Sequence, residues 1–396
     1  MATLVFALSL LLPLAPGKAQ MQAAKSPSPA FASGPYPTIR VTLPKTDYRI
    51  RIDPKTGTPQ MPKDIVATAA VQNWPADAPV PTVFTWRVYL DWDFPAYPTH
   101  HRINNQTFTQ ASPLKVNLDG EIRGGLLTVV AKALLNGQEV CGQAHATILG
   151  ENPPRKTVLR AYPRSRFGLI ASKVGMAESG LRQFTSPNGL DPGGWPLVSR
   201  TNDVGIMQLN APSGAISSAD QVWDWRANVQ RGLEMLRGKQ RNVVVLASRH
   251  AVGLHRVPEE CGTQMAMLNC ARMLLGLPCL QPPSVPPLSD KAGSGALPGE
   301  ADPDKLALSQ VEREAIRRYN GGREYAYVIQ PDPTTLGIQR AEWQIDPTRG
   351  GIRPTSGDPN YVRKVLLARS GLTLPPPPKP KSAHSHRSHR RHKRHR

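Results

Sequence analysis

The stretch LLTVVAKALLNGQEVCGQAHATIL, residues 126–149, carries the clearest fold signal in the chain. Small and apolar residues occupy every second position on both sides of Asn136-Gly137. A period of two is typical of half-buried strands, and Asn-Gly favours the positive φ angles of a tight hairpin turn. The stretch therefore predicts two antiparallel strands that meet at residues 136 and 137.

The same alternation occurs upstream, where Phe84, Trp86, Val88 and Leu90 are separated by more polar residues. Several short strands broken by Pro, Gly and Asn over roughly a hundred residues are typical of a β-sandwich. We therefore expect an all-β, immunoglobulin-like domain over residues 36–150.

Beyond residue 154 the apolar spacing changes to that of helices. Phe167, Ile170, Ala171 and Val174 stand at i, i+3, i+4 and i+7, which places them on one helix face. A further helix is expected over about residues 227–239. The second domain, residues 155–372, is therefore predicted to be mainly α-helical.

Capping signals mark two later helices. Ser309-Gln310-Val311-Glu312 is a capping-box pattern, and Asp358-Pro359 supplies an N-cap and a first-turn proline for a last helix that should end at Gly371. Between the helices, Pro- and Gly-rich sequence at about 277–303 predicts a long surface insertion.

The two ends of the chain differ from these domains. Residues 1–19 hold an apolar run too short to span a bilayer, followed by small residues, as in a secretory signal peptide, so export to the periplasm or cell envelope is expected. Residues 20–35 predict a flexible linker. Residues 373–396 predict a disordered tail, Pro-rich and then rich in His, Arg and Lys.

The chain carries a formal net charge of +20, which favours a polyanionic partner. The basic tail lacks aromatic residues for stacking on bases, so no specific nucleic-acid partner is expected. Attraction of the tail to anionic wall polymers or lipid is the simpler interpretation.

Four cysteines occur, Cys141, Cys261, Cys270 and Cys279, and an oxidising compartment would allow two disulfides whose pairing stays open. Their spacing lacks the paired C-x-x-C ligands of a structural zinc site, so no metal is expected.

Glu178 is the outstanding candidate for chemistry. It continues the apolar stripe one helical turn beyond Val174, and Leu181 follows on the same side. A carboxyl that faces the core without a cationic partner should have a raised pKa, because burial disfavours its charged form. Such a group can act as a general acid near neutral pH.

Four short motifs follow one another in a distinctive order. They are Glu178-Ser179-Gly180, Gly205-Ile206-Met207-Gln208, Arg318-Tyr319-Asn320-Gly321-Gly322 and Tyr361-Val362. Together they resemble the lytic transglycosylase family, which is similar to goose-type lysozyme in fold, over about residues 165–372. The resemblance implies a lysozyme-like catalytic domain after the β-sandwich.

The resemblance also implies a substrate and a set of roles. The substrate would be the glycan strands of peptidoglycan, cleaved with formation of 1,6-anhydromuramic acid and without a metal or organic cofactor. Glu178 would be the catalytic acid and base. The substrate-binding residues would be Ser179, Gly205, Met207, Gln208, Tyr319, Asn320 and Tyr361.

The sequence departs from the family in two places. About two dozen residues separate Ser179 from Gly205, and Arg-Tyr-Asn-Gly-Gly stands where Ala-Tyr-Asn-Ala-Gly is more usual. Neither change removes a catalytic group, but both leave the substrate preference open.

Two other functions remain open from the sequence. A muramidase-type hydrolase would need a second carboxylate to activate water, and Asp203 or Asp191 could supply it. A non-catalytic wall-binding component of an envelope-spanning assembly, with protein partners, would fit the β domain and the tail. The intact Glu178 argues against the second of these.

Overall fold

The computed structural model describes residues 36–94, 97–118, 120–188, 191–250, 288–322, 324–331, 339–345, 357–358 and 360–373. The expected signal peptide, the linker 20–35, nearly all of the tail 373–396, the first part of the 277–303 insertion and three of the cysteines lie outside these ranges. Cys141 lies on an exposed strand position and forms no disulfide.

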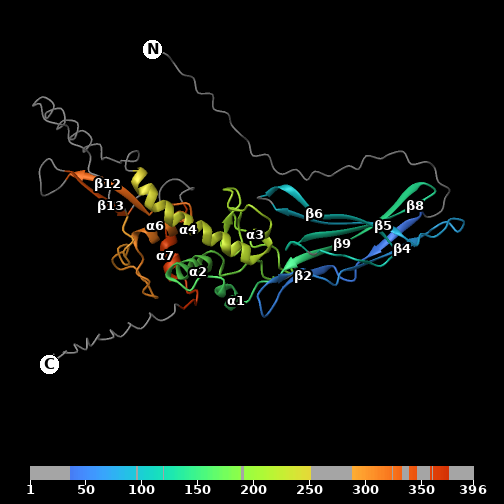
Figure 1. Cartoon of the computed structure of the whole chain (residues 1–396), viewed down its shortest axis with the longest axis horizontal. Coiled ribbons are helices and arrows are strands. Elements are labelled where there is room, and N and C mark those ends of the chain that lie inside the picture. Colours follow the sequence, from blue (N-terminus) through green and yellow to red (C-terminus); the bar gives the residue numbers. More distant parts are fainter. Residues whose placement is uncertain are drawn as a thin grey trace, which may run out of the picture.

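Strands make up residues 36–150, the β region, at one end of the molecule (Figure 1). They are β1 (Thr38–Thr42), β2 (Asp47–Ile52), β3 (Pro59–Gln60), β4 (Val66–Gln72), β5 (Phe84–Phe94), β6 (Tyr97–Gln110), β7 (Leu114–Lys115), β8 (Gly125–Leu135) and β9 (Gln138–Gly150). One sheet has the order β1-β4-β7, and a larger one has the order β3-β2-β9-β8-β5-β6.

The predicted hairpin at residues 126–149 is confirmed. β8 and β9 pair antiparallel up to Leu135 and Gln138, and the turn residues Asn136 and Gly137 have φ angles of 50° and 78°. Leu127 is fully buried, as a period of two requires for its face of the hairpin. The alternation from Phe84 to Leu90 likewise lies in β5, with its apolar side chains buried.

The predicted fold class, an immunoglobulin-like sandwich followed by a mainly α lysozyme-like domain, is wrong. The large sheet is mixed and forms a half-barrel, because β2 runs parallel to the end of β9. Strands account for about 29% of the residues and helices for about 24%. The region after residue 154 adds strands of its own, so a mainly α lysozyme-like domain is not evident.

Residues 155–373, the C-terminal region, combine helices with two small hairpins (Figure 1). The helices are α1 (Arg155–Arg160), α2 (Arg166–Ser179), α3 (Asp220–Trp223), α4 (Trp225–His250), α6 (Gln310–Tyr319) and α7 (Tyr361–Leu367). The hairpins pair β10 (Asp203–Val204) with β11 (Leu209–Asn210), and β12 (Tyr325–Pro331) with β13 (Gln339–Ile345). Of the helices described, none combines the length and the apolar character needed to cross a bilayer.

Helix boundaries follow the local signals in part. The capping box is present at α6, where Ser309 and Glu312 each bind the other's backbone N–H. The last helix, α7, runs from Tyr361 to Leu367 and ends before Gly371, and the predicted first-turn proline, Pro359, lies outside the described residues. Asp358 accepts a hydrogen bond from the N–H of Asn360 instead of capping the helix.

The two regions share one apolar core. At their joint the Trp223 ring, 1% exposed, lies within 6.0–6.4 Å of the rings of Trp92, Phe184 and Trp195. Gly124 allows this packing, since an added Cβ would come within 2.2 Å of the Trp223 ring. Packing of Trp92 and Gly124 of the β region against the Trp223 ring of the C-terminal region therefore contributes to the contact between the regions.

The loop before β10 is tied to the β region by polar contacts as well. The guanidinium of Arg49 on β2 donates to the carbonyls of Pro192 at 3.0 Å and Gly193 at 3.2 Å. The N–H of Gly150, at the end of β9, donates to the carbonyl of Gly194 at 2.8 Å. Residues 192–194 of the loop between α2 and β10 are thus held against the β region.

Trp223→Ala should lower the free energy of unfolding by about 3–5 kcal/mol, because it empties the aromatic joint. Chemical denaturation followed by circular dichroism would measure the loss. Leu134→Ala is the control, since Leu134 is 72% exposed and its truncation should change little. Equal stability of the two variants would show that the joint contributes little.

Candidate active site

Glu178 lies in the last turn of α2. Ser165 caps its start, with a hydroxyl that accepts from the N–H of Gly168, and Gly180, with a φ of 66°, caps its end. A left-handed residue at this point lets the chain leave the helix at once. The chain therefore leaves the helix at Gly180, two residues beyond Glu178. The preceding turns of α2, up to Gly175, are buried.

Burial raises the pKa of Glu178 from its ordinary 4.5 to about 7. The negative charges of Asp203 and Asp358 act in the same direction, while a hydrogen bond from Tyr361 and the charge of Lys364 lower the pKa. Desolvation is the largest of these effects, as the position of Glu178 on the apolar face predicts. The carboxyl is therefore about half protonated at neutral pH.

Two tyrosines from other helices line the carboxyl. The hydroxyl of Tyr361, at the start of α7, donates to Oε1 of Glu178 at 2.5 Å. Tyr319, at the end of α6, donates to the carbonyl of Met207 at 2.7 Å. Burial and the nearby Glu178 raise the pKa of both phenols well above the usual value, so both remain donors at neutral pH.

The tight turn that joins β10 to β11 lies against the end of α2, where the Ser179 hydroxyl donates to the carbonyl of Ile206. Gly205 has a φ of 72°, and an added Cβ would come within 2.5 Å of Gln183 Oε1 and 2.6 Å of Asn228 Nδ2. These two buried amides bind the turn: Gln183 accepts from Ile206 N at 3.2 Å, and Asn228 accepts from Met207 N at 2.9 Å. Gly205 is therefore a structural requirement of the turn.

Met207 and Gln208 both make contacts within the protein. The Met207 side chain is fully buried, with Gly175 on α2 and Gly232 on α4 leaving room for it. Gln208 donates from Nε2 to the carbonyl of Gly205 at 2.8 Å, within its own turn. In this structure Met207 packs in the core, and its carbonyl positions Tyr319.

Ser179 and Asn320 are also engaged by the protein. The buried hydroxyl of Ser179 donates to the carbonyl of Ile206 at 2.8 Å, which ties α2 to the turn. Oδ1 of Asn320 accepts from the N–H of Asp358 at 2.5 Å, just before α7. Both residues hold the elements around Glu178 in place.

Asp203 and Asp191 are the carboxylates that a hydrolase could use. Asp203 accepts hydrogen bonds from Ser199, Thr201 and Asn210, which fix it at the base of its hairpin. Asp191 accepts from the N–H of Gly193 at 2.8 Å within a local turn. Each carboxylate therefore accepts hydrogen bonds from residues close to it in the sequence.

Several residues of the site escaped the sequence analysis. They are Tyr162, which donates to the Met207 sulfur at 3.3 Å, and the two amides Gln183 and Asn228. Their neighbours in the sequence give no sign of these contacts. Their partners come from other parts of the chain, so only the fold reveals the contacts.

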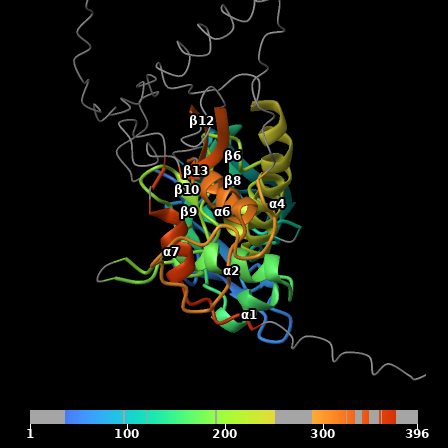
Figure 2. The same cartoon turned by 90° about the vertical axis from the view of Figure 1, so that its left-hand side faces the viewer.

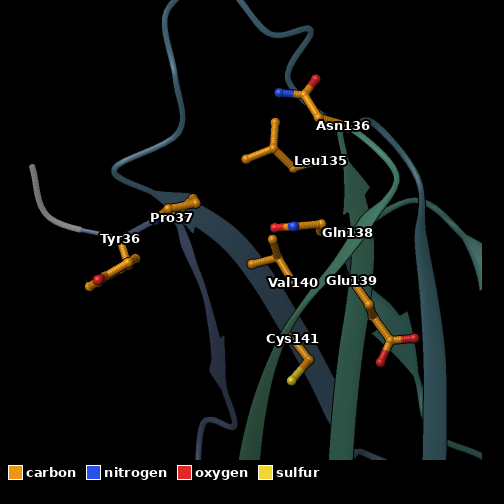
Figure 3. Close-up of a pocket in the computed structure, with 8 residues that line it drawn as sticks. All are labelled: Tyr36, Pro37, Leu135, Asn136, Gln138, Glu139, Val140 and Cys141. Atoms are coloured by element: carbon orange, nitrogen blue, oxygen red, sulfur yellow. The ribbon is translucent and has the colours of Figure 1, made fainter. Parts of the chain in front are cut away.

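A separate hollow of about 380 Å³ lies in the β region (Figure 3). It is lined by Tyr36, Pro37, Leu135, Asn136, Gln138, Glu139, Val140 and Cys141. Glu139 is already paired with Lys132 at 2.6 Å. The extended β9 places Gln138 about 40 Å from Gly150, so this hollow lies far from the joint with the C-terminal region.

Within the described ranges, no group of three or more His, Cys, Asp or Glu side chains is arranged to hold a metal ion. Comparisons with family models, with curated proteins and with solved structures gave no match. The chemistry of the Glu178 site is therefore the basis for assigning a function.

The raised pKa of Glu178 predicts that the free energy of unfolding depends on pH. Between pH 4.5 and about 7 the unfolded chain releases a proton that the folded chain keeps, so wild-type stability falls as pH rises through this window. Glu178→Gln carries no such proton. It should match the wild type near pH 4 and exceed it by about 3 kcal/mol above pH 7.

Denaturant titrations of both proteins at several pH values would measure this difference. Parallel stability curves for the wild type and Glu178→Gln would contradict the raised pKa.

Proposed function

We propose that the protein cleaves the β-1,4 bond between N-acetylmuramic acid and N-acetylglucosamine in peptidoglycan, as a lytic transglycosylase. The observation that carries this proposal is a single, partly buried carboxyl, Glu178, with a pKa of about 7 and one oxygen held by Tyr361. No described residue donates to its second oxygen, Oε2, which leaves that atom for a ligand.

In the first step, protonated Glu178 gives its proton to the glycosidic oxygen as the bond from that oxygen to the muramyl C1 breaks. A group with a pKa near the working pH suits proton transfer in both directions. The substrate's own N-acetyl carbonyl stabilises the positive charge that develops at C1.

In the second step, ionised Glu178 takes the proton from the muramyl 6-hydroxyl while that oxygen bonds to C1. The product is 1,6-anhydromuramic acid, Glu178 is protonated again, and no water is consumed. Tyr361 stabilises the ionised form between the two steps through its hydrogen bond to Oε1.

The surroundings of Glu178 favour this reaction over hydrolysis. Asp203 and Asp358 are the two carboxylates whose charges raise its pKa. Asp203 is held by three side-chain donors, and Asp358 is paired with Lys364 at 2.7 Å. A water-activating base would need a carboxylate free to approach the opposite face of the sugar.

The wider chemistry of the chain suits a substrate in the cell envelope. The net charge of +20 favours attraction to an anionic wall polymer. Export to the periplasm or envelope, expected from residues 1–19, would bring the protein to peptidoglycan.

Mass spectrometry of the fragments released from purified peptidoglycan tests the proposal. The wild type should release anhydro-ended muropeptides, and Glu178→Gln should release none, because Gln cannot exchange the proton. Asp203→Asn is the matched control and should still form anhydro ends at a reduced rate. Reducing ends that disappear in Asp203→Asn would establish the hydrolase instead, and retention on the wall without cleavage would establish a binding module.

Cleavage should also depend on pH through Glu178. The first step needs the protonated carboxyl, so the initial rate should fall about tenfold per unit well above pH 7. Rates measured from about pH 5 to 9 at constant ionic strength would show this limb. A rate that rises with pH across this range would rule out Glu178 as the initial acid.

A further inference from the structure

Lys173 is a buried charged residue that the proposed chemistry does not use. It lies on α2 five positions before Glu178, and its side chain is 0% exposed. Burying an ammonium group is costly unless other groups bind it fully. Its partners therefore indicate what the residue does.

The three N–H donors of the Lys173 ammonium all have partners. Nζ donates to the carbonyls of Leu366 and Ala368 at 2.8 Å each and pairs with the carboxylate of Asp304. Leu366 lies in the last turn of α7, and Ala368 follows its end. Carbonyls at this position lack helical partners and attract a cation.

The contacts of Lys173 and Glu178 form two connections between α2 and α7, which lie beside each other and beside α6 (Figure 2). Lys173 binds Leu366, and Glu178 accepts from Tyr361. On α2, Lys173 lies five residues before Glu178, and on α7, Tyr361 lies five residues before Leu366. Five residues correspond to about 7.5 Å along a helix. The equal spacing means that fixing one connection sets the register of the other.

Further contacts support the same end of α7. Ser172 donates to the hydroxyl of Ser370 at 2.8 Å, and Arg155 donates to the Ser370 carbonyl at 2.8 Å. At the other end of α7, Asn320 holds Asp358. The short helix that carries Tyr361 is thus bound on both sides.

We propose that Lys173 is a positioning residue that sets the hydroxyl of Tyr361 against Glu178 by anchoring the end of α7. Its catalytic meaning rests on the proposed function, but the placement itself does not. A lysine that only stabilised the core would lower the stability of the fold without changing the Tyr361–Glu178 hydrogen bond in the folded protein.

The titration of Glu178 in the folded protein reports that hydrogen bond directly. The groups that interact with the Glu178 charge come from β10, α6 and α7 with the residues just before it, and they are Asp203, Tyr319, Asp358, Tyr361 and Lys364. Among them, the hydrogen bond from Tyr361 is the largest effect that lowers the pKa of Glu178.

The experiment compares the wild type, Lys173→Met, Tyr361→Phe and the double variant. The Glu178 carboxyl carbon is followed by NMR in ¹³C-glutamate protein and assigned by its absence in Glu178→Gln. Tyr361→Phe should raise the titration midpoint by about one pH unit, because the carboxylate loses a donor. Lys173→Met should also raise the Glu178 titration midpoint. The double variant should have the same midpoint as Tyr361→Phe.

Lys132→Met is the matched control, since it removes a lysine paired with Glu139 in the β region and should leave the Glu178 midpoint unchanged. If Lys173→Met does not fold, Lys173→Gln, which keeps an amide donor in the same space, should shift the midpoint in the same direction. A folded Lys173 variant with the wild-type midpoint, or shifts that add in the double variant, would overturn the proposal.

No substrate enters this titration, so its result is independent of peptidoglycan cleavage. Shifted midpoints in a protein that releases no muropeptides would uphold the positioning role and reject the proposed function.

Discussion

The hydrogen bond from Tyr361 to Glu178 joins two helices that are far apart in the sequence, and the site depends on it. Burial alone would hold the Glu178 carboxyl in its neutral form. A phenol held against one oxygen keeps the ionised form accessible, so that the same group can release a proton and accept one. The remaining contacts of the site place these two side chains opposite each other.

The backbone around this pair is held by polar groups of the same motifs. Ser179, Asn320 and the Met207 carbonyl each bind another element of the C-terminal region. Met207 fills space that Gly175 and Gly232 leave open. These residues make a rigid frame, which is what pre-organised catalysis requires.

The β region contributes to the same frame. The aromatic joint at Trp223 and the contacts of Arg49 with the loop before β10 bind the regions together. That loop leads into the Gly205 turn, where the N–H of Gly205 donates to the carbonyl of Leu197 at 2.8 Å and continues the connection. The β region thus supports the approach to the site as well as its own core.

Local sequence signals predicted the local structure well. The Asn136-Gly137 hairpin, the β5 alternation, the Ser309 capping box and the inward position of Glu178 all follow from contacts within a few residues. The predicted fold class was wrong because the arrangement of the sheet depends on pairing between strands that are far apart in the sequence. The parallel contact of β2 with β9 joins segments about a hundred residues apart, and alternation gives no sign of it.

The same limit applies to single residues. Lys173 and Met207 have no local feature that marks them as anchors, since their partners come from distant segments. The predicted sugar-contact roles of Met207, Ser179 and Asn320 rested on motif position, whereas the packing uses their polar atoms or side chains internally. The sugar-binding roles of these residues stay predictions, and the fold shows which contacts the residues already make within the protein.

The central claim is that Glu178 acts alone and that no water enters the reaction. Digestion of purified peptidoglycan in H₂¹⁸O, followed by mass spectrometry of the new glycan ends, tests it most directly. The account predicts anhydro ends that contain no ¹⁸O. New reducing ends that each carry one ¹⁸O atom would contradict it, because they would show that water, activated by a second base, completes the cleavage.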